Sequence, residues 1–313
     1  MNRDFIKDIL LGVSVGDAIG VPVEFKSRQE LTYHPVDSMI GFGTHHQPPG
    51  TWSDDSSLTF CLAEMLCGKY DLENLARRFI NWKNNGYWTA HGRVFDIGIA
   101  TSDAIDRLER GVSPVLAGGH EVSSNGNGSL MRILPLLFLI RNNNIDSRFL
   151  IINHVSSLTH RHIRSVLSCF IYLELALQLL SGNEKTDAYR QACTTVRTFL
   201  DETATCTEEE KAHFARILSG AINKLSQDEI YSTGYVIHTL EASLWCLLNT
   251  WNYKDAVLKA ANLGNDSDTT AAVTGGLAGL LYGSQTIPEE WLAVLARRAE
   301  IEDLSRRLNK KFS

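Results

Sequence analysis

The feature that most constrains the fold is a helical spacing of apolar residues that recurs along almost the whole chain. Phe5, Ile9 and Val13 follow one another at intervals of four residues, and few stretches alternate with period two. The chain has only seven prolines, several of them where a helix is expected to begin or to be absent. This pattern predicts an all-α fold with helices near 4–16, 56–68, 72–84, 95–110, 129–140, 146–157, 161–181, 186–200, 208–225, 235–249, 253–263, 269–282 and 288–308.

A chain of 313 residues can bury a substantial core in one large domain. Three long connections interrupt the predicted helices, at 20–53, 84–94 and 111–128. They are rich in Gly, His, Trp and charged residues, which is typical of functional loops and not of linkers. The sequence contains no internal repeat, low-complexity tract or obvious domain linker. We therefore expect a single domain over 1–313.

The composition argues against several classes of function. The net charge of −6 gives no support for electrostatic binding to nucleic acid or to an anionic membrane. The sequence contains no apolar run of about 18 residues, so no transmembrane helix is predicted, and the first residues lack the layout of a signal peptide. The six cysteines form no C-x-x-C pair, which is typical of reduced cysteines. The sequence thus predicts a cytoplasmic protein.

Two clusters of oxygen-bearing side chains stand at expected helix starts, far apart in the chain. Their members are Ser53, Asp54 and Asp55 in the first, and Asp266, Asp268 and Thr269 in the second. Ser and Asp are also favoured helix caps, so either cluster alone is typical of a cap. Each cluster, however, offers more oxygens than one cap needs. If the fold joins the clusters, these hard ligands favour Mg²⁺, Mn²⁺ or Ca²⁺.

Three further segments carry candidate chemistry. Glu24 has apolar neighbours that would suit an acid exchanging protons near neutral pH, although a solvated loop acid is the alternative. The segment 125–132 leads from a glycine-rich loop into an apolar stretch. Its backbone N–H groups and Arg132 suit phosphate oxygens, unless the glycines serve only a tight turn. His160, in L-T-H-R-H, is either a site residue or an ordinary cap or surface histidine.

Taken in order, these motifs resemble those of the ADP-ribosylglycohydrolase family, which includes the dinitrogenase-reductase-activating glycohydrolase. The resemblance covers nearly the whole chain and rests on G-D-A-I-G-V-P-V-E-F (16–25), W-S-D-D-S (52–56), F-D-I-G (95–98), N-G-S-L-M-R-I-L-P (127–135), S-L-T-H (157–160) and G-N-D-S-D-T-T-A-A-V-T-G-G-L-A-G (264–279). It implies a single compact orthogonal helical bundle of about a dozen or more helices, in agreement with the apolar spacing. The departures are mild: N-G-S-L-M-R replaces the frequent N-G-A-A-M-R, and His162 stands where a Pro is common.

The resemblance also implies roles for particular residues. Two Mg²⁺ or Mn²⁺ ions would be held by Ser53, Asp54, Asp55, Asp266, Asp268 and Thr269. The catalytic residues would be Glu24, Asp55 and Asp96, with the proton-transfer acid open between Glu24 and Asp96. ADP-ribose would contact Asn125, Gly126, Asn127, Gly128, Ser129, Met131, Arg132 and His160.

The implied reaction is metal-dependent hydrolysis of the glycosidic bond between ADP-ribose and a modified target, with release of ADP-ribose. The motifs lean towards ADP-ribosyl-arginine on a protein, and a nucleic acid enters only as a modified substrate. The alternative is an immunity or interaction protein of the same fold that neutralises an ADP-ribosyltransferase toxin by binding. An isoprenoid synthase would need a third acid in D-D-x-x-D, where Leu58 stands. A D-x-D-x-T phosphatase would need an apolar strand before Asp266, and the spacing of an EF-hand is missing.

Overall fold

The computed structural model describes residues 3–312, and within that range the chain is helical with no sheet, only isolated β-bridges. The all-α prediction is therefore confirmed. The helices are α1 (Phe5–Gly20), α2 (Arg28–Tyr33), α3 (Asp54–Leu66), α4 (Leu72–Asn85), α5 (Ile99–Glu109), α6 (Pro114–Ala117), α7 (Leu137–Ile140), α8 (Ile145–Ser157), α9 (Ile163–Leu180), α10 (Lys185–Glu202), α11 (Glu208–Ala212), α12 (Ala215–Leu218), α13 (Val236–Leu248), α14 (Tyr253–Ala261), α15 (Ser267–Tyr282), α16 (Glu289–Val294) and α17 (Arg298–Phe312). Short 3-10 turns lie at η1 (Val21–Val23), η2 (Gly43–His45), η3 (Val122–Ser124), η4 (Leu134–Leu136), η5 (Ile222–Lys224), η6 (Gln227–Glu229) and η7 (Ser284–Thr286).

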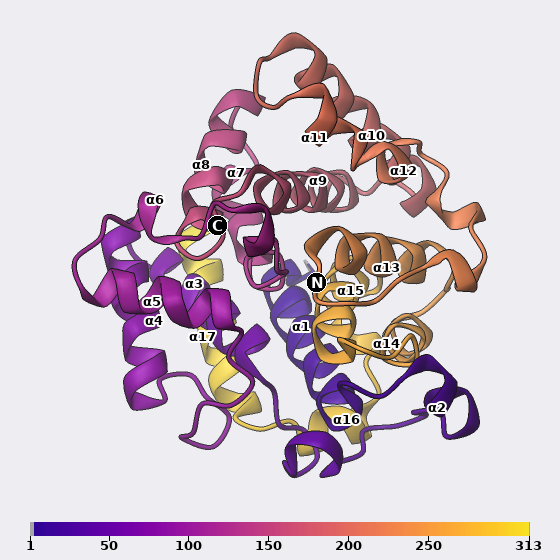
Figure 1. The fold of residues 1–313 in the computed structure, drawn as a ribbon. Coiled ribbons are helices and arrows are strands. Elements are labelled where there is room, and N and C mark those ends of the chain that lie inside the picture. Colours follow the sequence, from indigo (N-terminus) through magenta and orange to yellow (C-terminus); the bar gives the residue numbers. More distant parts are fainter. Residues whose placement is uncertain (1–2, 313) are drawn as a thin grey trace.

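The first helix lies at the centre of the molecule and packs most extensively against α15 (Figure 1). Glycines make this approach possible, because a Cβ on Gly12 or Gly16 would overlap the carbonyl oxygen of Gly275 or Ala271. At the C-terminal end of α1, Ser267 Oγ donates a hydrogen bond to the Gly20 carbonyl at 3.0 Å. This contact fixes the start of α15 against the end of α1, where the acidic motifs lie.

The buried apolar side chains form one contiguous cluster that runs from Ile6 in α1 to Leu308 in α17. Figure 1 shows α4 to α6 on one side of α1 and α13 to α15 on the other, with α9 and α10 above them. Helices from both ends of the chain thus share one core. The expectation of a single domain stays a prediction that this packing supports.

Helix α9 is long and apolar enough to cross a membrane by length and composition. Most of its residues are buried inside the molecule, where it packs against α8, α10 and α13. Its apolar character is therefore explained by its place in the core.

Most predicted helices are present, but two were predicted too long. The stretch 208–225 is not one helix, because α11 ends before the buried Phe214 and α12 is a separate turn. The stretch 288–308 is interrupted after α16, where Arg297 has a φ of 49° and the Ala296 N–H donates to the Gly50 carbonyl. In both places a tertiary contact outweighs helical spacing.

Two other predictions placed the start of a helix too early. The stretch 129–140 becomes regular only at the 3-10 turn η4, in which Pro135 occupies one of the first positions. The stretch 95–110 becomes helical at Ile99, after Asp96 with a φ of 55°. The predicted connection 20–53 contains α2 and two 3-10 turns. The non-helical residues before these helix starts, and the connection 20–53, contribute residues to the cleft described below.

Candidate functional site

The two acidic clusters meet at the floor of a cleft, where the N-termini of α3 and α15 face each other. Thr269 Oγ1 donates a hydrogen bond to Asp55 Oδ2 at 3.3 Å, and Ser53 Oγ donates to the same oxygen at 3.0 Å. Asp55 Oδ2 thus accepts one hydrogen bond from its own cluster and one from Thr269, which lies 214 residues further along the chain. The predicted meeting of the two clusters is confirmed.

Helix capping accounts for only part of the two clusters. Ser53 caps α3, because its side chain accepts a hydrogen bond from the Asp55 N–H at 3.3 Å. Asp266 occupies the N-cap of α15 but makes no capping hydrogen bond with its side chain. Its Oδ2 instead accepts from Asn127 Nδ2 at 2.9 Å. The side chain of Asp266 is therefore directed into the site, while Asp268 Oδ1 accepts a hydrogen bond from the Thr269 N–H of its own helix at 2.8 Å.

A further buried carboxylate, Asp17 near the end of α1, lies beside the two clusters. It accepts hydrogen bonds from the Ser53 N–H at 2.9 Å, the Ser56 N–H at 3.0 Å and the Ser56 hydroxyl at 2.5 Å. Asp17 thereby holds the start of α3 against α1. No role was predicted for Asp17 from the sequence, because a single acid in an apolar helix is a weaker signal than a cluster.

Without a bound cation, the close grouping of these buried carboxylates is electrostatically unfavourable. Burial, and then the negative charge of neighbouring carboxylates, raises the pKa of Asp54, Asp55 and Asp268 well above the usual range. Burial also raises the pKa of Asp17 to about 6, against the hydrogen bonds from Ser53 and Ser56 that lower it. Compact acidic groups of this kind need a positive partner.

The donor atoms fit a hard divalent cation. Among the described residues, Asp55 Oδ1, Asp266 Oδ1 and Asp268 Oδ2 are buried without a hydrogen-bond partner. Oxygens of Asp17, Asp55 and Asp268 lie within 4.8 Å of one another, as do oxygens of Glu24, Asp266 and Asp268. Unpaired buried carboxylate oxygens are costly, and a cation that accepts oxygen ligands removes that cost. The site can therefore hold metal ions of the Mg²⁺ or Mn²⁺ type.

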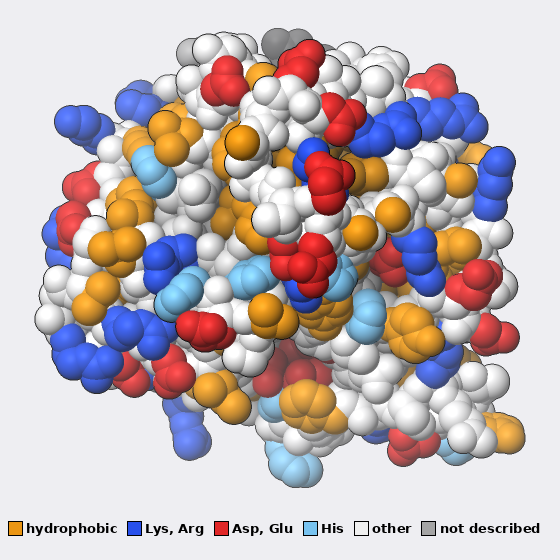
Figure 2. Space-filling view, turned by 45° about the horizontal axis from the view of Figure 1, so that its top comes forward, with side chains coloured by type: hydrophobic (Ala, Val, Ile, Leu, Met, Phe, Trp, Pro, Cys, Tyr) orange, Lys and Arg blue, Asp and Glu red, His pale blue; other side chains and the backbone are white. Residues whose placement is uncertain are grey.

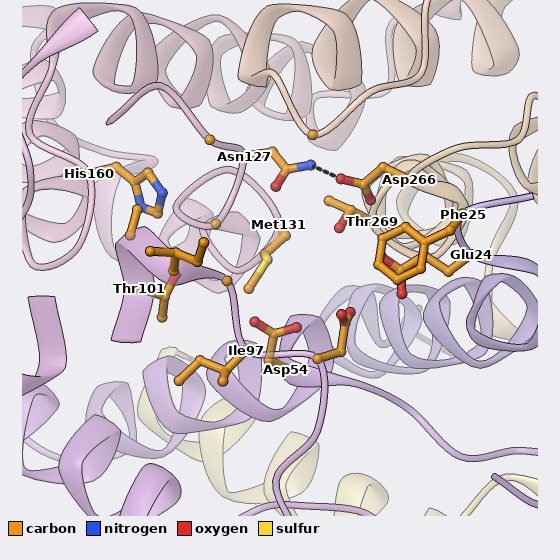
Figure 3. Close-up of a pocket in the computed structure, with 17 residues that line it drawn as sticks. Glu24, Phe25, Asp54, Ile97, Thr101, Asn127, Met131, His160, Asp266 and Thr269 are labelled. Atoms are coloured by element: carbon orange, nitrogen blue, oxygen red, sulfur yellow. Dashed lines mark hydrogen bonds between the residues drawn. The ribbon is translucent and has the colours of Figure 1, made fainter. Parts of the chain in front are cut away.

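The cleft above these carboxylates has a volume of about 360 Å³. Figure 3 shows Glu24, Asp266 and Thr269 at one end, His160 with Thr101 at the other, and Asp54 between them. The cleft thus has a carboxylate end and a more neutral end. Its lining residues are Glu24, Phe25, Asp54, Asp96, Ile97, Gly98, Ile99, Ala100, Thr101, Gly126, Asn127, Gly128, Met131, His160, Gly234, Asp266 and Thr269.

Backbone groups dominate the neutral end of the cleft. Helix α5 begins there, its first residues line the cleft, and its N-cap, Gly98, offers no side-chain capping bond to the first N–H groups of the helix. The loop of Gly126 and Gly128 lies opposite, beside the ring of His160. Burial lowers the pKa of His160 to about 3, so this histidine is neutral. A helix start and a glycine loop of this kind suit phosphate oxygens.

Three residues expected to contact substrate lie outside the lining of the cleft. Arg132 is fully buried, donates to the carbonyls of Gly128 and Val155, and lies over the ring of Phe79. Ser129 bonds within the core to Ser156, and Asn125 binds its own loop. The structure therefore places these three residues behind the glycine loop, where they support its shape.

At the carboxylate end, Glu24 and Asp96 stand close together at the mouth of the cleft. Burial and the charge of Asp266 raise the pKa of Glu24 to about 8, and burial and the charge of Glu24 raise that of Asp96 to about 7. His45 Nε2 is hydrogen-bonded to Glu24 Oε2. His45 and the lining residues 99–101 were not singled out from the sequence, because nothing local marks them; Ile97 and Gly98 belong to the F-D-I-G motif.

The whole chain resembles proteins of one family. A family model described as ADP-ribosylglycohydrolase matches residues 2–313. ADP-ribosylarginine hydrolase Tri1 of Serratia proteamaculans is 34% identical over 97% of this chain and 79% of its own length, and Tri1 of Pseudomonas putida is 34% identical over 97% and 78%. ADP-ribosyl-[dinitrogen reductase] glycohydrolase of Rhodospirillum rubrum is 26% identical over 93% and 90%. A solved structure titled ADP-ribosylglycohydrolase-related protein complex superposes with a TM-score of 0.81, at 29% identity over 99% of this chain and 98% of the other.

Proposed function

Because the chain belongs to the ADP-ribosylglycohydrolase family and is a hydrolase of ADP-ribosyl linkages, we propose that it cleaves ADP-ribosyl-arginine on proteins with the help of two Mg²⁺ or Mn²⁺ ions. The observation that carries this proposal is the joined pair of acidic clusters on the floor of the cleft, with three buried carboxylate oxygens left unpaired. The metal ligands are Ser53, Asp54, Asp55, Asp266, Asp268 and Thr269, with Asp17 and Glu24 near enough to contribute.

Bound divalent cations would supply Lewis-acid polarisation and orientation of the ribose hydroxyls. Residues of the chain bind the diphosphate, position the acidic groups and transfer the proton. The glycine loop at 126–128 and the start of α5 receive the diphosphate, while Asn127 holds Asp266 in place. The C1″–N bond breaks as the oxygen of water bonds to C1″, and the leaving nitrogen keeps the electron pair and takes a proton. Either Glu24 or Asp96 accepts a proton from the attacking water and returns a proton to the leaving nitrogen, so that no proton is lost or gained overall.

Arginine as the modified residue is supported by two observations. The relatives with 34% identity are named ADP-ribosylarginine hydrolases. The mouth of the cleft also carries Glu24 and Asp96, and no Lys or Arg lines the cleft within the described part of the chain. A cationic guanidinium is favoured beside such carboxylates. The partner would accordingly be an ADP-ribosylated protein or another ADP-ribose conjugate.

The test is release of ADP-ribose from arginine-, serine- and nucleic-acid-linked substrates in Mg²⁺, Mn²⁺ or EDTA. We expect release from the arginine linkage with either metal and none in EDTA. Preferential release from another linkage would correct the substrate and leave the reaction class intact. No release from any substrate would favour the alternative of an immunity protein that neutralises an ADP-ribosyltransferase toxin by binding. A cytoplasmic location also stays a proposal, which fractionation of cells that express the protein would test.

A further inference from the structure

We infer that His45 is a positioning residue of this hydrolytic reaction, which holds the carboxylates of Glu24 and Asp96 together across the mouth of the cleft. The inference rests on the proposed function, since it assigns His45 a part in placing the proton-transfer acid. None of the sequence motifs includes His45, and only the fold brings it to the site.

The contacts of His45 join the two candidate acids. Its Nε2 is hydrogen-bonded to Glu24 Oε2 and lies 4.0 Å from Asp96 Oδ1. Nε2 faces both carboxyl groups, and the tautomer that carries its hydrogen on Nε2 donates that hydrogen to Glu24. Among residues 3–312, no Lys or Arg nitrogen lies within 4.0 Å of either carboxylate. His45 is thus the donor that lets the two acids stand side by side.

The loop that carries His45 is built against the segment that carries Glu24. Thr44 Oγ1 donates to the Glu24 carbonyl at 2.7 Å, which gives the loop a second attachment to the same residue. Gly43 has a φ of 52°, and a Cβ there would overlap the Pro22 carbonyl. Phe42 and His46 have φ values of 66° and 54°, in the left-handed region that non-glycine residues rarely adopt. Such strain persists only where surrounding contacts hold it, and it clusters at functional sites.

Aromatic rings fix the direction of the imidazole. Its centroid lies 6.0 Å from that of Phe25 and 5.2 Å from that of Phe95, and the side chain is only 15% exposed. Phe25 and Asp96 both have left-handed backbones, with φ values of 64° and 55°. The backbone at Asp96 and directly after Glu24 is therefore as constrained as that of the loop. Nε2 is held towards the two carboxylates and away from solvent.

The position of Glu24 matters because the same carboxylate belongs to the acidic group with Asp266 and Asp268. When both are ionised, Glu24 and Asp96 are like charges in a largely desolvated part of the cleft, and they then repel each other unless a donor stands between them. Loss of His45 would let Glu24 turn away from the reacting carbon. A misplacement of about 1 Å in a catalytic group can lower the rate about 100-fold.

The experiment compares His45→Leu and His45→Gln with the wild type on an ADP-ribosyl-arginine peptide at saturating Mn²⁺. We expect His45→Leu to lower kcat about 100-fold with KM within about threefold. His45→Gln keeps an N–H donor and should recover at least about tenfold of that loss. The matched control is His46→Asn, because His46 is exposed on the same loop and Asn tolerates its left-handed backbone. This control should behave like the wild type.

Two readouts separate positioning from general damage. Mn²⁺ affinity, measured by calorimetry on the metal-depleted protein, should change by less than about threefold in His45→Leu, because the ligands on α3 and α15 remain. Melting temperatures should stay close to that of the wild type. The inference is wrong if His45→Leu keeps its kcat, if the loss is in KM or metal affinity, or if a folded His45→Gln is no better than His45→Leu. A wild type that releases no ADP-ribose would instead overturn the proposed function, and this inference with it.

Discussion

At the scale of single residues, the chemistry of the site follows from carboxylates that the fold buries next to one another. Asp55, Asp268 and Asp17 are each fully enclosed, yet only Asp17 has both oxygens engaged by donors of the protein. The difference separates a carboxylate that organises the site from carboxylates whose unpaired oxygens could bind a cation. The sequence predicted Asp55 and Asp268 because they lie in dense clusters, and it missed Asp17 because a lone acid in a helix has no such mark.

The substitution Asp268→Asn tests the role of one of these unpaired oxygens. The amide is nearly isosteric but is a much weaker ligand for a hard cation. We expect kcat/KM to fall at least about 100-fold and Mn²⁺ affinity to fall in parallel. The metal-depleted variant should melt at a higher temperature than the metal-depleted wild type, because one of several repelling carboxylates has gone. Calorimetry and thermal melts provide the measurements, and unchanged Mn²⁺ affinity would refute the assignment of Asp268 as a ligand.

The buried His160 gives a pH dependence of stability that can be isolated by mutation. Burial lowers its pKa to about 3 from an ordinary 6.5, so the unfolded chain binds a proton that the folded chain does not accept. The stability that neutral His160 allows is complete above pH 6.5 and is lost as pH falls towards 3, by about 1.4 kcal/mol per pH unit. Between pH 6 and pH 5, urea unfolding of the wild type should lose about 1 kcal/mol more than that of His160→Asn. Equal losses in the two proteins would show that His160 is protonated in the folded state.

At the scale of elements, the packing of α1 against α15 decides where the two acidic motifs lie. Gly12 and Gly16 on one helix meet Gly275 and Ala271 on the other, backbone to backbone. Helical spacing in the sequence predicted both helices, but it does not say which two helices pair. The helices predicted at 208–225 and 288–308 failed for a related reason, since Phe214 is buried in the shared core and the Ala296 N–H bonds to the distant Gly50 carbonyl.

Replacement of Gly16 by alanine tests this element. Its Cβ would overlap the Ala271 carbonyl, so the two helices must move apart. We expect a loss of about 1–3 kcal/mol in the free energy of unfolding, with reduced metal affinity because the ends of α1 and α15 separate. Gly68→Ala is the control, since a Cβ there meets only the Met65 carbonyl at 3.6 Å. Equal unfolding free energies for Gly16→Ala and the wild type would show that the close packing is not needed.

At the scale of the whole molecule, charge is distributed so that the cleft is acidic while the surface is mixed. Figure 2 shows Lys and Arg dispersed among Asp and Glu on the face in view, without one continuous basic patch. The net charge of −6 agrees with the absence of a basic surface patch. Substrate recognition is therefore expected in the cleft and not on a charged outer surface. An acidic interior of this kind would be stabilised by bound cations.

Metal binding should therefore stabilise the molecule as a whole. A cation present at about 100 times its dissociation constant adds about 2.7 kcal/mol per site to the free energy of unfolding. We expect Mg²⁺ and Mn²⁺ to raise the melting temperature of the metal-depleted protein by several degrees, and EDTA to reverse the rise. NaCl at equal ionic strength is the control for screening. A melting temperature that does not respond to either metal would contradict the binuclear site.

The sequence by itself determined the all-α class, most of the helices and the identity of the acidic clusters, because apolar spacing and dense oxygen ligands are local features. Only the tertiary structure decided that Thr269 reaches Asp55, that Asp17 holds α3, that Arg132 lies behind the glycine loop and that His45 bridges Glu24 and Asp96. The physical reason is that these contacts join segments distant in the chain. Their formation depends on how closely α1 and α15 approach and on left-handed backbone at a few loop residues, and spacing along the sequence records neither.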